Sequence, residues 1–417
     1  MSPEAEYRPD DVVVTGLGTV NPLGGDVETT WSALLKGTCA VRILEHEWAE
    51  CHDLPVRIGA PLAVDPADLL PPRQLRRLDR ASQCALLAAR QAWEQAEAPQ
   101  VASQRLAVSV SPGMGPVLSV MEAWDTLRDK GPRRVLPTAV PALMPNAPAA
   151  AVGIELGAHG GIHAPVSACA SGAEAIAYGA DLIALGRADI VVAGGTDAAL
   201  HPMTVAAFGA MKALSTRNTD PQAASRPFAP DRDGFVLGEG SGILVLERAA
   251  HAIARNARVL AVLASSGVTA DAYDVARPKP SGAEQERALR LALERAGLDA
   301  GDVGHVNAHA TSTPTGDVVE AGVLARTVPN AAVSATKSAT GHLLGGAGGL
   351  EAVLTVMALQ ESWAPPTLLP AGVDPELARL GLDVVGPQGR DLPRLAAAAS
   401  TSFGFGGHNV ALVFTRR

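Results

Sequence analysis

The chain of 417 residues lacks the features of a small disulfide-stabilised protein and of a membrane protein. Aromatic side chains make up only 3% of it, so its core must be built from alanine, valine and leucine. Its N-terminus, MSPEAEYRPDD, is polar and acidic and does not resemble a signal peptide. It contains no run of about 18 apolar residues that could cross a membrane. We therefore expect a cytoplasmic protein without a membrane partner.

Cysteine is also scarce. The four cysteines are Cys39, Cys51, Cys84 and Cys169, and they form no CxxC pair. No Cys/His spacing typical of zinc ligands occurs either, so the sequence predicts no structural metal. In a reduced compartment we expect all four thiols to be free.

Positive charge and three common catalytic motifs are missing as well. The net charge of −9 disfavours nonspecific nucleic-acid binding, which needs a basic face. A dinucleotide-binding GxGxxG motif fails because Asn21 stands where its third glycine is required. The GKS or GKT of a phosphate-binding loop does not occur. A GxSxG nucleophile turn around Ser241 is also excluded, because Glu239 stands where the first glycine of that motif is required.

What the chain does have is a regular alternation of apolar strand-like runs and helical patterns. The alternation begins again near residue 258, which divides the chain into two similar halves, 1–255 and 256–417, without a strict repeat. Alternating strands and helices indicate an α/β protein whose sheets are mostly parallel. We expect strands at 11–18, 105–111, 189–195, 241–247, 259–263 and 410–414, and helices at 83–97, 173–185, 284–296 and 348–359.

One stretch, residues 164–185, places a cysteine between a strand-like run and a helix. The run 164–167 leads into Cys169, and a Ser171-Gly172 turn precedes the helical pattern. Unpaired N–H groups and the positive dipole end gather at a helix start, and both favour a thiolate near neutral pH. Cys169 is thus a candidate nucleophile, although a lone cysteine is also a common small core residue.

Three polar segments rich in small residues interrupt the apolar pattern of the second half. The first, 307–317, contains His309; the second, 334–342, contains Lys337 and His342 and runs into glycines; the third, 402–409, flanks Phe405 with glycines. Each segment also fits an ordinary capped loop. Taken with Cys169, they suggest a Cys-His-His site.

The residues 73–80 carry four arginines. Their spacing places Arg73, Arg76, Arg77 and Arg80 on one face of a helix. Such a face is often only solvated, but in an acidic protein it is also a plausible dock for an acidic partner.

These motifs together resemble the β-ketoacyl-[acyl carrier protein] synthases of the I/II type, which are thiolase-like condensing enzymes. The resemblance runs from Val12 to Phe414 and rests on VSACASGAEAI (166–176), ALSTRN (213–218), RPFAPDRDGFVLGEG (226–240), NAHATSTPTGD (307–317), SATKSATGH (334–342) and SFGFGGHN (402–409). It implies a duplicated αβαβα five-layer sandwich, usually a homodimer. The half 1–255 would carry the nucleophilic cysteine, and the half 256–417 would carry two catalytic histidines.

The resemblance also implies a decarboxylative Claisen condensation. Cys169 would accept an acyl chain, with the backbone N–H groups of Cys169 and Phe405 as oxyanion hole, and Phe405 as gate. His309 and His342 would bind a malonyl thioester, and Lys337 would orient the two histidines. Residues matching supporting positions are Glu351, Thr311, Thr313 and Asp317, and those matching the acyl pocket are Met114 and Phe208.

The implied partner is an acyl carrier protein loaded with an acyl or a malonyl group. Both substrates would be thioesters of its phosphopantetheine arm, and no other cofactor is implied. By position, the carrier dock would consist of Arg73, Arg76, Arg77 and Lys212.

Two departures from the family pattern bear on specificity. Ala310 stands where most members have glycine, and Asp274 stands where many have histidine. Three other functions share the fold: a thiolase, which pairs two cysteines with one histidine; a chain-length factor, a non-catalytic partner that lacks the cysteine; and a ketosynthase of a polyketide or other specialised pathway. Cys169 with two histidines argues against the first two.

Overall fold

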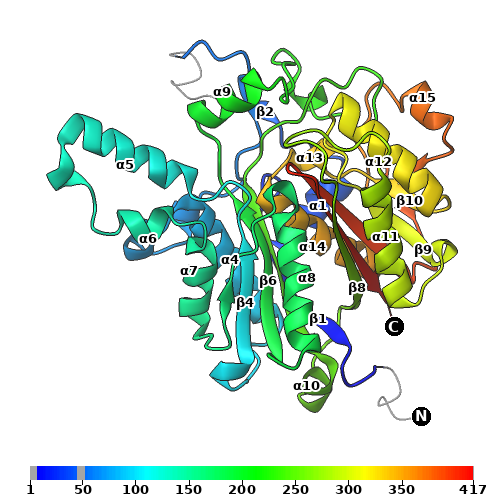
Figure 1. The fold of residues 1–417 in the computed structure, drawn as a ribbon, viewed down its shortest axis with the longest axis horizontal. Coiled ribbons are helices and arrows are strands. Elements are labelled where there is room, and N and C mark those ends of the chain that lie inside the picture. The colour runs from blue at the N-terminus through cyan, green and yellow to red at the C-terminus, as the bar shows by residue number, and fades with distance from the viewer. Residues whose placement is uncertain (1–6, 45–51, 417) are drawn as a thin grey trace.

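The computed structural model describes residues 7–44 and 52–416 (Figure 1). Cys51 lies outside these residues, and Cys39, Cys84 and Cys169 are free thiols. The strands of the main sheet are β1 (Val12–Val20), β4 (Leu106–Ser111), β5 (Ile162–His163), β6 (Ile190–Asp197), β7 (Gly240–Arg248), β8 (Ala261–Ala270), β9 (Val303–Asn307), β10 (Ala332–Ser334), β12 (Asp383–Val384), β14 (Ala397–Gly404) and β15 (His408–Thr415). Two small sheets pair β2 (Arg42–Ile43) with β3 (Ile58–Gly59) and β11 (Trp363–Ala364) with β13 (Arg390–Asp391).

The strand order reveals a duplication. The first half contributes β5-β4-β6-β7-β1, and the second contributes β10-β9-β14-β15-β8 with β12 added at the far edge. In that order, both halves pair their strands parallel, parallel, antiparallel and antiparallel. The halves join through β1 and β8, which share only two residue pairs, Val13 with Val262 and Val14 with Ala261.

The sheets are therefore mixed, and the expectation of mostly parallel strands is wrong. The clearest reason lies in the segment that carries Phe405. Gly406 and Gly407 adopt φ values of 84° and 78°, which residues with side chains rarely do. They turn the chain tightly, so β15 returns antiparallel beside β14 without a crossover helix.

The helices form three layers around the two halves of the sheet (Figure 1). On the outer face of the first half lie α4 (Arg80–Gln95) and α7 (Ala147–Leu156). Between the halves lie α8 (Ser171–Ala184), which contacts β6 and β15, and α14 (Gly345–Glu361), which contacts β7 and β14. Over the outer face of the second half lie α11 (Ala283–Ala296) and α12 (Pro314–Thr327). This is the thiolase-like five-layer αβαβα arrangement that the resemblance implied.

The central layer explains the small-residue composition. A Cβ on Gly349 of α14 would lie 2.2 Å from the carbonyl oxygen of Gly242 in β7, so the helix approaches the strand as closely as glycine allows. Around this contact the core is built from side chains such as Leu244, Val353 and Leu412, all fully buried. Burying one such side chain contributes roughly 1.5–3 kcal/mol.

Two local expectations fail. The run 164–167 is not a strand, because β5 already ends at His163. The arginine segment is not one helix: α3 (Pro72–Leu75) stops before the chain turns, and Asp79 caps the start of α4. Arg80 consequently turns inward to pair with Glu239, at 3.0 Å. Only Arg73, Arg76 and Arg77 remain exposed.

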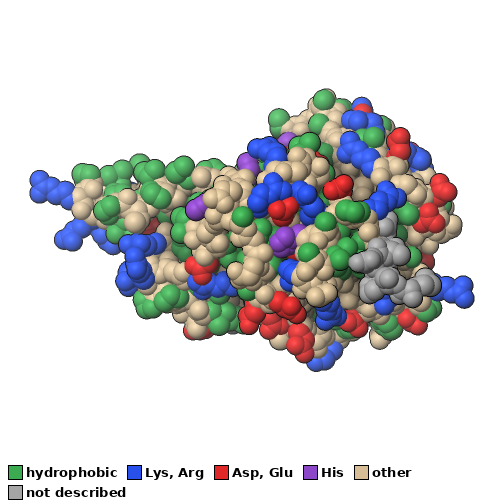
Figure 2. All heavy atoms as spheres, turned by 90° about the horizontal axis from the view of Figure 1, so that it is seen from below, with side chains coloured by type: hydrophobic (Ala, Val, Ile, Leu, Met, Phe, Trp, Pro, Cys, Tyr) green, Lys and Arg blue, Asp and Glu red, His purple; other side chains and the backbone are tan. Residues whose placement is uncertain are grey.

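An arm formed by α5 (Val117–Lys130) and α6 (Ala139–Leu143) projects from the first half, at the left of Figure 1. Trp124, Leu136 and Val140 on this arm are each more than half exposed. Figure 2 shows hydrophobic side chains along the arm and basic ones at its tip. Among the described residues, no helix is both long and apolar enough to span a membrane.

The remaining helices are short connectors: α1 (Val27–Leu35), α9 (Pro202–Ala210), α10 (Ala249–Ala254), α13 (Lys337–Thr340) and α15 (Pro375–Ala378). Of these, α13 begins at one of the candidate site residues.

Candidate active site

A cavity of about 410 Å³ opens where the loops of the two halves meet, and most of the expected site residues line it. The first half contributes Cys169, Met114, Phe208 and Lys212 to its wall. The second half contributes His309, His342, Phe405, Thr311, Thr313 and Asp317. Lys337 and Glu351 do not line the cavity. Lys337 contacts both His309, which does line it, and Glu351.

Cys169 lies in a 3₁₀ turn, η5 (Ala168–Ala170), directly before α8. The hydroxyl of Ser171 fixes this turn, because it accepts from the N–H of Ser167 at 2.8 Å and donates to the carbonyl of Ala168 at 2.6 Å. The backbone N–H of Phe405, from the other half, lies close enough to the Cys169 sulfur to lower the pKa of the thiol. The sulfur thus sits at a helix start beneath a backbone donor.

The thiolate expected from the helix start is not favoured at Cys169. Burial raises the pKa of Cys169 to about 12, although the positive charge of Lys337 and the Phe405 N–H both act to lower it. The free-energy cost of removing the thiolate from water exceeds the stabilisation that these two groups provide. The resting site therefore holds a thiol at neutral pH.

His309 is held by a buried ion pair. The Lys337 ammonium lies 3.4 Å from Nδ1 of His309 and pairs with Glu351, whose pKa is raised by burial. An ammonium has donors only, so Nδ1 accepts and we assign the ring proton to Nε2. Burial and the neighbouring Lys337 charge hold the pKa of His309 well below its usual value. His309 is accordingly a neutral N–H donor.

His342 presents a second neutral ring. Its centroid lies 5.3 Å from that of His309, with the rings edge to face. Burial and Lys337 hold the pKa of His342 well below its usual value. Both of its ring nitrogens lack a hydrogen-bond partner within the described part of the chain. A buried donor left unpaired is costly, which suggests that a ligand oxygen completes it.

Glu320, which sequence reasoning missed, orients the backbone that carries His309. Its Oε1 accepts from the N–H of His309 at 2.8 Å, and its Oε2 accepts from the N–H of Ala310 at 2.6 Å. The Thr401 hydroxyl donates to the same Oε1 at 2.7 Å. The available signal was a second acidic residue, three positions after Asp317, in a helix that is mostly apolar.

Asp197, also missed, ties the two halves together beside the cavity. One of its oxygens accepts from the N–H of Gly113 at 2.8 Å and from the N–H of Gly345, the first residue of α14, at 2.7 Å. Burial nevertheless outweighs these donors and raises the pKa of Asp197 to about 7. A carboxyl that ends an otherwise apolar strand was the signal in the sequence.

Asp317 shapes the loop between His309 and α12. It accepts from the N–H groups of Phe228 at 2.8 Å and Ser312 at 3.1 Å, and burial raises its pKa to about 7. The hydroxyls of Thr311 and Thr313 lie 3.1 Å apart along the same loop and face the cavity.

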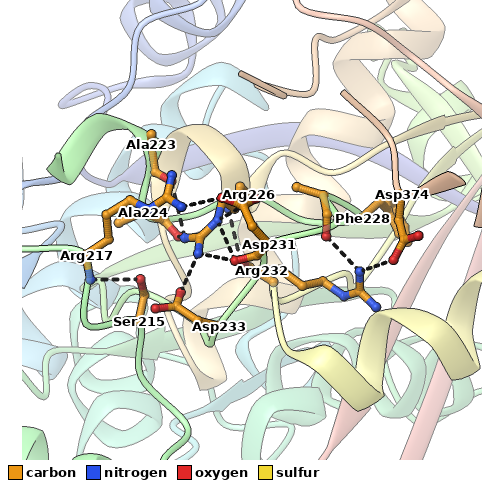
Figure 3. A network of polar contacts seen from close by, with 12 residues as sticks. Ser215, Arg217, Ala223, Ala224, Arg226, Phe228, Asp231, Arg232, Asp233 and Asp374 are labelled. Atoms are coloured by element: carbon orange, nitrogen blue, oxygen red, sulfur yellow. Dashed lines mark hydrogen bonds and ion pairs between the residues drawn. The ribbon is translucent and has the colours of Figure 1, made fainter. Parts of the chain in front are cut away.

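Two arginines of the first half lie beside this loop, and Figure 3 shows their contacts with Asp233 and Asp374. Arg226 is almost fully buried and pairs with Asp233 at 3.0 Å, while its backbone N–H donates to the Ser312 hydroxyl at 3.1 Å. Arg232 pairs with Asp374 at 3.0 Å. Segments of both halves are thereby locked around the cavity.

The exposed arginines lie elsewhere. Arg73, Arg76 and Arg77 line a separate groove against α5 and α6, which also contains Glu122. Lys212 lines the active-site cavity instead. The structure therefore does not gather the four basic residues into one hollow.

Within residues 7–44 and 52–416, no cluster of three or more His, Cys, Asp or Glu side chains is arranged to hold a metal ion.

Comparison with known proteins gives consistent matches over the chain. Models of the β-ketoacyl synthase N-terminal and C-terminal domains match residues 9–252 and 260–369. The 3-oxoacyl-[acyl-carrier-protein] synthase 2 of Mycobacterium tuberculosis is 42% identical over 412 residues, covering 97% of each chain. The enzyme of the same name from Staphylococcus aureus is 40% identical over 411 residues, covering 97% of this chain and 98% of its own.

Solved structures agree with these relatives. A β-ketoacyl synthase from Burkholderia phymatum superposes with a TM-score of 0.89 at 36% identity, covering 98% of this chain and 99% of its own. A type II polyketide ketosynthase, solved with its acyl carrier protein and a bound hexaketide, gives a TM-score of 0.89 at 29% identity, covering 98% and 100%.

Proposed function

The chain belongs to the β-ketoacyl synthase family, and we propose that it elongates acyl chains by decarboxylative condensation with a malonyl carrier protein. The observation that carries the proposal is the pairing of a sulfur under a backbone donor with two neutral histidines in one cavity. An acyl acceptor and a site for negative charge thus face the same space.

In the first stage, the Cys169 sulfur attacks the thioester carbonyl of an acyl carrier protein. The new bond joins sulfur to the acyl carbon, the carrier thiolate leaves, and the cysteine proton goes to that thiolate. The N–H groups of Cys169 and Phe405 stabilise the oxyanion between these events. The high pKa of the thiol supports a proton transfer that accompanies attack, rather than a preformed thiolate.

In the second stage, a malonyl thioester replaces the departed carrier. His309 and His342 donate N–H groups to its thioester oxygen, so that loss of carbon dioxide leaves a stabilised enolate. The enolate carbon then attacks the acyl group on Cys169 and forms the 3-oxoacyl carrier, and the sulfur leaves as a thiolate that takes a proton from water. Removing one such donor costs about 3–4 kcal/mol in enzymes that stabilise an oxyanion.

The other site residues take supporting roles in the proposal. Lys337 with Glu351 fixes the tautomer of His309, and Asp317 fixes the loop of Thr311 and Thr313. Those two hydroxyls would contact the pantetheine arm. Phe405 would gate the cavity, since glycines flank it. The acyl chain would lie along Met114 and Phe208.

We propose that the acidic carrier docks on Arg73, Arg76 and Arg77, with Lys212 nearer the cavity. Their exposure supports this role. Reversing Arg76 and Arg77 to glutamate should weaken carrier binding, measured by titration, much more than R379E/R394E, which reverses two other exposed arginines. Equal losses in the two variants would assign the effect to overall charge.

We also propose that each chain divides into its two halves between residues 255 and 256. We further propose that two chains form a homodimer. The arm's exposed Trp124, Leu136 and Val140, together with the open edge of β5, support a partner copy. Light scattering should give twice the mass of one chain.

The experiment that tests the function is a chain-length series. The purified protein is supplied with acyl carriers of increasing length and a malonyl carrier, and products are read by mass. A product two carbons longer than each accepted chain is expected. No product with any acyl carrier would overturn the proposal.

The same experiment separates fatty-acid elongation from polyketide assembly. Repeated unreduced additions would favour the polyketide alternative, whereas one addition per turnover fits elongation. The 40–42% identity to 3-oxoacyl-carrier synthases supports elongation over the 29% identity to the polyketide ketosynthase. A non-catalytic chain-length factor would not be acylated at Cys169.

A further inference from the structure

The loop 271–279 forms part of the cavity mouth, and it is firmly anchored. Asp271 accepts from the Asn409 amide at 2.8 Å and from the N–H of Lys279 at 2.8 Å. Gly406, in the turn beside Phe405, donates its N–H to the carbonyl of Val275 at 2.9 Å. The loop therefore has a fixed position relative to the cavity.

Asp274 organises the tip of this loop around an arginine. Its Oδ1 accepts from the N–H groups of Ala276 at 2.9 Å and Arg277 at 3.0 Å. Its Oδ2 accepts from Nη2 of Arg277 at 3.3 Å. These N–H groups and the guanidinium lower the pKa of Asp274, so it is ionised at neutral pH. One carboxylate thus shapes the turn and directs the arginine side chain.

Arg277 retains most of its binding capacity. Its side chain is 78% exposed, and Asp274 is the only partner found for its guanidinium among the described residues. A guanidinium offers five N–H donors, so four remain for a ligand. Arg277 also lines the active-site cavity, as does Lys212 from the first half.

We propose that Arg277, directed by Asp274, binds the phosphate of the carrier's phosphopantetheine arm at the cavity mouth. The inference rests on the proposed function, because that arm is how both substrates would enter. The forked donors of a guanidinium match phosphate oxygens in pairs, which an ammonium cannot do. Lys212 supplies the net positive charge that the Asp274–Arg277 pair lacks.

The ordinary alternative is a solvated surface ion pair, and the chain provides one for comparison. Arg287 pairs with Glu284 at 2.6 Å with the same three-residue spacing, and its side chain is 55% exposed. This pair lies on α11, and neither Glu284 nor Arg287 lines the cavity. Arg287→Ala is therefore a matched control for Arg277→Ala.

The test compares thioesters that differ only in the phosphate. The rate of Cys169 acylation is measured with an acyl-4′-phosphopantetheine and with the same acyl-pantetheine, and acyl carrier protein serves as a third donor. A charge-assisted hydrogen bond is worth about tenfold or more, so R277A should lower the rate ratio of phosphorylated to unphosphorylated donor about tenfold. R277K should recover only part of the ratio, and R287A should keep that of the unchanged protein.

Three results would overturn the phosphate site. If the ratio in R277A equals that in R287A, the arginine does not read phosphate, while the proposed function stands. If none of the three donors acylates Cys169 in the unchanged protein, the proposed function fails and the phosphate site fails with it. A loss for acyl carrier protein alone, with the small-donor ratio intact, would assign Arg277 to the carrier surface and also overturn the phosphate site.

Discussion

The two halves of the molecule share a strand pattern but differ in the chemistry they place at the cavity. Cys169 lies between β5 and α8, and Lys337 and His342 lie at the corresponding point between β10 and α14. The cysteine has an apolar setting and depends on backbone donors, whereas His309 depends on a buried side-chain network. One backbone frame thus places a sulfur at the cavity from the first half and two imidazole rings from the second.

The largest expected effect comes from removing the nucleophile. Cys169→Ala should lower condensation at least about 10⁴-fold, as loss of a covalent nucleophile does in other enzymes. Product formation from an acyl carrier and a malonyl carrier, followed by mass, measures it. Cys84→Ala, which removes another buried thiol, is the control for a simple loss of packing. Condensation retained in C169A would refute the division of labour between the halves.

Removing a donor in the second half should act on the other stage. His309→Ala is expected to slow carbon dioxide release from a malonyl carrier about 10²–10³-fold, because one N–H donor to the enolate is lost. Release of labelled carbon dioxide measures this rate, and the exposed His159→Ala is the control. A larger loss in Cys169 acylation than in carbon dioxide release would contradict the assignment.

The junction between the halves should depend on pH. Burial raises the pKa of Asp197 to about 7 from an ordinary value of 3.8. The proton on Asp197 therefore favours the folded state, and this contribution is complete below pH 3.8 and lost as the pH rises through 7.

Asp197→Asn removes that titration. Between about pH 4 and pH 7 the protein should lose, relative to D197N, on the order of 3 kcal/mol of unfolding free energy. Denaturant unfolding at several pH values measures the difference. A difference that is constant with pH would show that Asp197 stays ionised in the fold.

The smallest effect tests how far the second-half network extends. Thr401→Val leaves Glu320 with one donor fewer in a buried site and should cost about 1–2 kcal/mol of stability. Thr401→Ser keeps the hydroxyl and should restore most of it, together with the rate of carbon dioxide release. If T401V is as stable as the unchanged protein while T401S is destabilised, the methyl packing of Thr401 matters and its hydrogen bond to Glu320 does not.

Much of this organisation could be predicted from the sequence. Apolar runs located most strands and helices, and the motifs around Cys169, His309 and His342 identified the residues that line one cavity. These features are local, since a strand, a helix start or a glycine turn is set by neighbouring residues.

Features that depend on distant partners could not be predicted. The inward turn of Arg80 depends on Glu239, more than 150 residues away, and the role of Asp197 depends on the N–H of Gly345. The pKa of Cys169 depends on burial by both halves, which outweighs the helix start that the sequence does reveal. The glycines after Phe405 indicate a tight turn and hence the antiparallel pairing of β15 with β14. The alternation of strand-like and helical runs instead favoured parallel strands.

The most direct test of the account measures carbon dioxide release from a malonyl carrier in C169A and in His342→Ala side by side. The account predicts that C169A still releases carbon dioxide, because both histidines and Lys337 are intact, whereas H342A loses the activity about 10²-fold or more. Equal losses in the two variants would contradict the separation of acyl acceptance and decarboxylation between the two halves.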